Sequence, residues 1–93
     1  MENTILVGII TQAQGIEKSN DYLDELDFLT ITAGGKVLKR FVQKMNMPNP
    51  KTFIGSGKIS EIKEYIEANN INTVIFDDEL SPTQERNISK IFN

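Results

Sequence analysis

Apolar and polar positions divide the chain into three segments with the pattern of β-strands. Residues 3–10 (NTILVGII) are apolar at successive positions, which is typical of a strand buried on both faces of a parallel sheet. Residues 36–45 (KVLKRFVQKM) favour a strand but carry cations on both faces, which fits the edge of a sheet. Residues 73–76 (TVIF) form a third, short apolar strand.

The first of three amphipathic segments follows the first strand. We expect a helix that begins at Asp21, with Ser19, Asn20 or Asp21 itself as its cap, and that ends at the glycine pair Gly34-Gly35. Its predicted buried stripe has the spacing of one helix face and consists of Tyr22, Leu26, Leu29 and Ala33.

Two further helices follow the second and third strands. Residues 57–69 place an apolar stripe on one side, formed by Ile59, Ile62, Tyr65 and Ile66. The run Ser81-Pro82-Thr83-Gln84 has the pattern of a capping box with proline at the first helical position, so a third helix is expected from there to the end of the chain. Its stripe consists of Gln84, Ile88, Ile91 and Phe92.

The order β-α-β-α-β-α predicts an α/β fold, a three-layer sandwich with a short parallel sheet. The charged second strand favours the strand order 2-1-3, in which the first strand is central. The third strand is too apolar for an edge, so residues 1–93 have the pattern of a single domain that lacks a fourth strand. We expect this exposed third strand to promote self-association.

Composition excludes several kinds of chemistry. The 93 residues include no cysteine and no histidine, which excludes disulfides, zinc sites built from these ligands and histidine-based acid/base catalysis. The apolar run Ile5–Ile10 is too short to span a membrane and has neither the basic flank nor the cleavage site of a signal peptide. A cytosolic protein is therefore expected.

Charge is divided unevenly along the chain. Residues 28–60 contain six basic and no acidic residues, a net +6, whereas the rest has four basic and thirteen acidic residues, a net −9. The basic part is either a solvated sheet edge or a local binding surface for polyphosphate or nucleic acid.

The segment FIGSGK, residues 53–58, resembles a phosphate-binding loop. It is no Walker A loop, because that loop requires glycine where this chain has Thr52 and a hydroxyl where it has Ile59. Glycines at a helix start can still bring bare backbone N–H groups to an anion, with Lys58 as the charge. A tight strand-to-helix connection explains the same residues without a ligand.

Acidic residues after the third strand are the other candidate chemistry. Asp77 and Asp78 could bind magnesium, or they simply suit the N-terminus of the helix that follows. Arg86 could reach a phosphate or form an exposed ion pair of little energetic value. No nucleophile has a base and an orienting group beside it, so we name no catalytic residue.

Two longer stretches together are much more specific. PNPKTFIGSGKISEIKEYI followed by TVIFDDELSPTQERNISK resembles the N-terminal domain of the HflX family of ribosome-associated GTPases. That family has P-D-P-x-x-Y-I-G-x-G-K before a helix and F-D-D-E-L-S-P-x-Q-x-R-N after the next strand. The departures are mild: Asn49 replaces a common aspartate, Phe53 a tyrosine and Glu85 a frequent glutamine.

The resemblance implies a domain that continues into a fourth strand, a helical linker and a separate GTPase domain, where GTP and magnesium bind. For this N-terminal domain itself we expect no cofactor and no catalysis. Its expected partners are the large ribosomal subunit with its ribosomal RNA and the protein's own GTPase domain. Such proteins split or rescue stalled ribosomes, and adenine-nucleotide binding by this domain is also proposed for them.

These lines of reasoning give two candidate functions. For ribosomal RNA binding, the predicted RNA- or phosphate-contacting residues are Lys39, Arg40, Lys51, Gly55, Ser56, Gly57, Lys58, Arg86 and Asn87. The alternative is a nucleotide-binding module with weak, magnesium-dependent ATPase activity, in which Asp77 or Asp78 contacts the metal or nucleotide.

Overall fold

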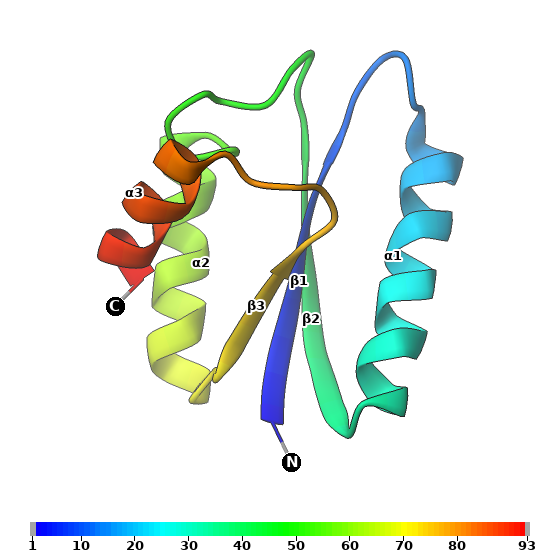
Figure 1. Cartoon of the computed structure of the whole chain (residues 1–93), viewed down its shortest axis with the longest axis vertical. Coiled ribbons are helices and arrows are strands. Elements are labelled where there is room, and N and C mark those ends of the chain that lie inside the picture. Colours follow the sequence, from blue (N-terminus) through cyan, green and yellow to red (C-terminus); the bar gives the residue numbers. More distant parts are fainter. Residues whose placement is uncertain (1, 93) are drawn as a thin grey trace.

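A parallel sheet lies between two layers of helices in the computed structural model, which describes residues 2–92 (Figure 1). The elements are β1 (Glu2–Ile10), α1 (Ile16–Thr32), β2 (Gly35–Lys44), α2 (Ser56–Asn69), β3 (Thr73–Phe76) and α3 (Pro82–Phe92). The strand order is β2-β1-β3, and both pairings are parallel. α1 covers one face of the sheet, and α2 and α3 cover the other. The predicted α/β sandwich and its strand order are confirmed.

β1 is central because its sequence buries both faces. Ile5, Val7 and Ile9 belong to the main apolar core together with residues of α2 and α3. Leu6 is also fully buried, and strand alternation directs it to the opposite face, toward α1. β1 pairs with β2 along its whole length and with β3 from Thr4 to Val7.

β2 is a charged edge strand, as its sequence predicts. Arg40 forms ion pairs with two carboxylates of α1, through Nη1 to Asp24 at 2.7 Å and Nη2 to Asp27 at 3.0 Å. Lys39 lies on the other face, with Nζ 4.9 Å from the ring centre of Phe41 and 5.3 Å from that of Tyr65 in α2. Two cations of β2 therefore contact opposite helical layers, Arg40 the α1 layer and Lys39 the α2 layer.

The predicted start and buried side of α1 are wrong. The helix begins at Ile16, after Gly15 in a left-handed conformation (φ 80°) with no side-chain cap. Its buried residues are Ser19, Leu23 and Thr30, whereas the expected stripe is largely outside: Tyr22 is 42% exposed and Leu29 is 53% exposed.

Two satisfied hydroxyls explain why small polar residues face the sheet. The Ser19 hydroxyl donates to the Ile9 carbonyl at 3.4 Å and accepts from Gln14 Nε2 at 2.7 Å. The Thr30 hydroxyl donates to the Leu26 carbonyl at 2.7 Å. Because both groups have partners, their burial leaves no hydrogen-bonding group unpaired.

The other two helices follow their predicted patterns. Ile59 and Ile62 of α2 are buried, and the left-handed Asn70 (φ 50°) ends that helix. Gln84 and Ile88 of α3 are buried as well. None of the helices in the described part of the chain is long and apolar enough to cross a membrane.

Two leucines of α1 test which side of the helix is buried. Leu23→Ala should reduce the free energy of unfolding by about 2–5 kcal/mol, because Leu23 is fully buried. Leu29→Ala is the matched control and should change it by less than about 0.5 kcal/mol, as expected of an exposed site. Urea unfolding of both variants measures this, and a larger loss for Leu29→Ala would contradict the packing of α1.

Candidate functional site

The loops that carry the sequence motifs meet at the carboxyl end of the sheet. The chain leaves β2 and β3 at this end, and α2 and α3 both begin there (Figure 1). In open parallel sheets this edge is where ligands bind.

The segment Asn49–Phe53 is a closed loop that its own first residue organises. The Asn49 N–H donates to the Phe53 carbonyl at 2.9 Å, and the Phe53 N–H donates to the Asn49 carbonyl at 2.8 Å. Asn49 Oδ1 also accepts from the N–H groups of Lys51 at 2.8 Å and Thr52 at 3.3 Å. An aspartate oxygen would accept the same bonds, so asparagine retains this function of the position.

Phe53 fixes how the loop enters the glycine segment. Its φ is 69°, uncommon for a bulky residue, within a γ-turn closed by the Ile54 N–H and the Thr52 carbonyl at 2.7 Å. Such backbone strain costs about 1–3 kcal/mol. Burial of the ring, which packs edge-on against Phe76 at 5.5 Å between centroids, offsets it.

The two glycines that follow differ in what the fold requires of them. The Gly55 N–H donates to Gln43 Oε1 at 2.8 Å, and a Cβ on Gly55 would lie 3.2 Å from Gln43 Nε2. A Cβ on Gly57 would meet no heavy atom within 4 Å, and its φ is not positive. Nothing in the described structure requires glycine at Gly57, and the space beside its backbone is open.

Several predicted contact residues gather around this opening. Ser56 and Lys58 lie in the first turn of α2, where Lys58 Nζ is 3.2 Å from Glu61 Oε2. This exposed pair is worth little, so the lysine can turn to another anion. Lys51 is exposed on the preceding loop.

α3 ties the loop to the rest of the fold. Gln84 is 8% exposed, and its Nε2 donates to the Asn49 carbonyl at 2.8 Å. Asn87 Nδ2 donates to the Lys51 carbonyl at 3.0 Å. Arg86, which lies between these two residues in the sequence, is exposed and has no ion pair within residues 2–92. Lys51, Asn87 and the glycine segment are therefore brought to one rim.

Gln84 has a second function that sequence analysis missed. As predicted, it completes a capping box, because its Oε1 accepts from the Ser81 N–H at 2.8 Å and its own N–H donates to Ser81 Oγ at 3.1 Å. The bond to Asn49 is additional. The only sequence signal for it is a polar side chain at a position of the buried stripe.

Two predicted contact residues lie elsewhere. Lys39 and Arg40 are in the middle of β2, paired with Ile5 and Leu6, and they point to opposite faces of the sheet. The Arg40 guanidinium is engaged by two carboxylates of α1. The structure does not bring these two residues to the glycine segment.

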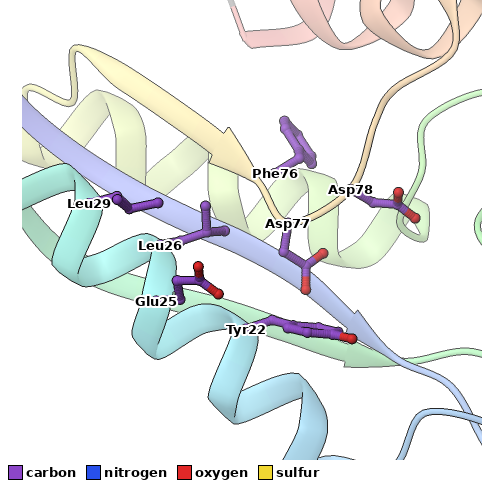
Figure 2. A pocket seen from close by; sticks show the side chains of 7 residues that line it. All are labelled: Tyr22, Glu25, Leu26, Leu29, Phe76, Asp77 and Asp78. Carbon is purple, nitrogen blue, oxygen red and sulfur yellow. The ribbon is translucent and has the colours of Figure 1, made fainter.

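Asp77 lies on the α1 side of the sheet. Its N–H donates to the Val7 carbonyl at 2.9 Å, and its carboxylate lies over Gly8, where an added Cβ would be 2.6 Å from Asp77 Oδ2. Figure 2 shows this carboxylate directed toward Tyr22 of α1. Burial, and to a lesser extent the charge of Asp78, raises the pKa of Asp77 to about 6.

Asp78 has a local role. Its Oδ1 accepts from the Glu79 N–H at 2.8 Å. Within residues 2–92, no group of three or more acidic side chains is placed to hold a metal ion. The arrangement as a whole offers bare backbone and cations at the glycine segment, and the carboxylate of Asp77 on the α1 side of the sheet.

Comparison with known proteins shows which family this sequence belongs to. Residues 20–93 match the family described as GTP-binding GTPase N-terminal. The chain is 63% identical to the GTPase HflX of Flavobacterium psychrophilum over 99% of its own length and 22% of that protein. The chain belongs to the HflX family. It is also 37% identical to the GTPase HflX of Escherichia coli, over 97% of its length and 20% of that protein.

The HflX relatives are much longer than these residues. The chain spans about a fifth of the length of the curated HflX proteins it matches. Both sequence motifs that resemble the HflX family fall in the matched range, and the structure joins them through the bonds from Gln84 and Asn87 to the loop at Asn49 and Lys51.

The environment of Asp77 predicts a pH dependence of stability. Its folded-state pKa of about 6 is above the ordinary value of 3.8, so the folded state binds more protons and stability falls as pH rises from about 4 to 6. Asp77→Asn mimics the protonated form and should raise the melting temperature at pH 7.5 but hardly at pH 4. Thermal unfolding measures this.

Glu64→Gln, on the exposed side of α2, is the control for removal of one negative charge. An increase in melting temperature that is the same at both pH values, or equal in the two variants, would contradict the burial of the Asp77 charge.

Proposed function

We propose that residues 1–93 form the N-terminal ribosome-docking domain of an HflX-type GTPase. In this proposal the domain binds ribosomal RNA of the large subunit, performs no catalysis itself and acts in the cytoplasm, where the whole protein splits or rescues ribosomes. The observation that carries the proposal is Gly57, whose bare backbone at the start of α2 is open although the fold does not require a glycine there.

Chemistry at the rim supports an RNA-backbone contact. Free N–H groups at a helix start favour an anion, and a glycine there allows a phosphate to approach the main chain closely. Lys58, in the first turn of α2, and Lys51, on the loop before it, are the cations near this opening, and Arg86 is an exposed cation of α3. Such contacts position a protein on RNA without reading its sequence.

The position of Asp77 favours RNA over a nucleotide whose magnesium ion this carboxylate would hold. An ATPase at the glycine segment would need an acidic side chain beside the phosphates to hold the metal. Asp77 lies on the other side of the sheet, over Gly8 and toward Tyr22.

The complete protein is proposed to hydrolyse GTP with magnesium in a domain outside these residues. This rests on the name of the relatives, GTPase HflX, and on their greater length. In the whole protein that GTPase domain would be the partner of the domain described here.

Binding to purified large ribosomal subunits tests the proposal. We expect saturable binding that weakens steeply between 50 and 200 mM salt, the range over which phosphate contacts lose affinity. Lys58→Ala and Arg86→Ala should each weaken binding. Each should also reduce the slope of log binding constant against log salt concentration by about 1, because one phosphate contact is lost. Lys63→Ala, further along α2, should leave both unchanged.

Gly57→Ala separates binding from folding in the same assay. Alanine should stabilise the first turn of α2 by up to about 1 kcal/mol and still weaken binding, because its methyl group occupies the space of the phosphate. Binding that is insensitive to salt and to these variants would reject the RNA contact. Displacement by ATP-magnesium would favour the nucleotide-binding alternative.

We also propose self-association through the free edge of β3, whose outer backbone groups have no strand beside them in the described sheet. Sedimentation equilibrium over a concentration series should show a rising mean mass. A constant monomer mass would reject this proposal.

A further inference from the structure

One face of the sheet is only partly covered. α1 packs against β1 and β2, and the opposite face carries both α2 and α3 (Figure 1). Val74 and Phe76 of β3 line a cavity with α3, so alternation directs Ile75 to the α1 side. Within residues 2–92, no second helix lies beside α1 over β3.

A groove occupies this uncovered place. It has a volume of about 430 Å³ and lies between α1 and the carboxyl end of β3 (Figure 2). Its apolar wall includes Tyr22, Leu26 and Leu29, which recur at the spacing of one helix face. We call it the α1–β3 groove. Three of the four residues in the apolar stripe predicted for α1, all but Ala33, thus line this groove and do not belong to the main core.

The charges around the α1–β3 groove are all negative. Glu25, Asp77 and Asp78 line it, and no lysine or arginine does. α1 itself carries five acidic residues and one lysine. A phosphate chain or an anionic membrane surface would be repelled here, whereas a cationic partner with an apolar side would be attracted.

The incomplete helical layer on this face favours a helix as the partner. Helices pack side by side at 8–10 Å, and a second helix beside α1 would complete the layer that β3 lacks. A second copy of this chain offers no suitable helix, because α1 is acidic while α2 and α3 have net charges of −1 and +1.

We propose that the α1–β3 groove is the docking site for a basic amphipathic helix of a partner protein. The apolar side of that helix packs on Tyr22, Leu26 and Leu29, and its lysine or arginine residues lie beside Glu25, Asp77 and Asp78. This site lies on the α1 side of the sheet and does not depend on the proposed RNA contact at the glycine segment.

A fluorescent 18-residue helical peptide of leucine and lysine, with all leucines on one face, is a suitable probe. Fluorescence anisotropy should show saturable binding, and a peptide of equal composition in scrambled order should bind at least about tenfold more weakly. NMR shifts of backbone amides should change mainly at residues 22–29 and 75–78.

Matched variants separate the groove from general attraction to an acidic protein. Leu29→Glu should weaken binding about tenfold or more, while Ile31→Glu should change it less than about twofold. Ile31 is on the same helix and 60% exposed, but it does not line the groove. Glu25→Gln with Asp78→Asn should reduce the salt dependence, and Glu64→Gln with Glu67→Gln on α2 should not.

Circular dichroism first establishes that each variant is folded. Equal effects of Leu29→Glu and Ile31→Glu, equal binding of the two peptides, or shifts centred on β2 would each overturn the proposal. Binding of phosphatidylglycerol vesicles that Leu29→Glu abolishes would identify a membrane-contacting surface instead and would also overturn it.

Discussion

Burial of β1 on both faces is the constraint on which the rest of the fold depends. A strand without a polar face needs a neighbour on each edge and a helical layer on each side. The chain meets this need with β2 and β3 as the edges, α1 on one face and α2 with α3 on the other. The carboxyl end of the sheet is consequently the place where the glycine segment, the acidic loop and two helix starts come together.

The loop before α2 is held in place by contacts with other parts of the fold. Phe53 has a strained backbone whose cost is offset by burial of its ring, and Gln84 and Asn87 of α3 bond to the carbonyls of Asn49 and Lys51. The two sequence motifs are thus one structural unit, joined by bonds between positions 35 and 36 residues apart. Packing and hydrogen bonding account for Asn49, Phe53, Gly55 and Gln84, whereas nothing in the described structure requires glycine at Gly57.

The pattern of apolar and charged residues predicts the architecture correctly, but it predicts the wrong buried side for α1. The uninterrupted apolar residues of β1 and the cations of β2 predict the strand order, since they specify a centre and an edge. In α1 the pattern points to Tyr22 and Leu29, but the buried side carries Ser19, whose hydroxyl bonds to the Ile9 carbonyl of β1, and Thr30, whose hydroxyl bonds within the helix. Sequence spacing does not contain that information.

The candidate site was predictable in part for similar reasons. Gly55, Lys58 and Asn87 are predicted contacts because motifs near helix starts have a known chemistry, and their contact with a ligand stays a prediction. The separation of Arg40 and Asp77 from them depends on which face of the sheet each side chain takes. Gln43, which accepts from the Gly55 N–H, gave no signal in the sequence, because its function exists only through a contact twelve residues away.

Gly8 and Asp77 show how this small sheet limits its own variation. The two positions are far apart in the chain, yet the carboxylate of one occupies the volume that a side chain on the other would need. Position 8 can therefore accept a methyl group only if position 77 gives up its carboxylate or turns it away. Substitutions at these two sites are expected to be tolerated as a pair more readily than one at a time.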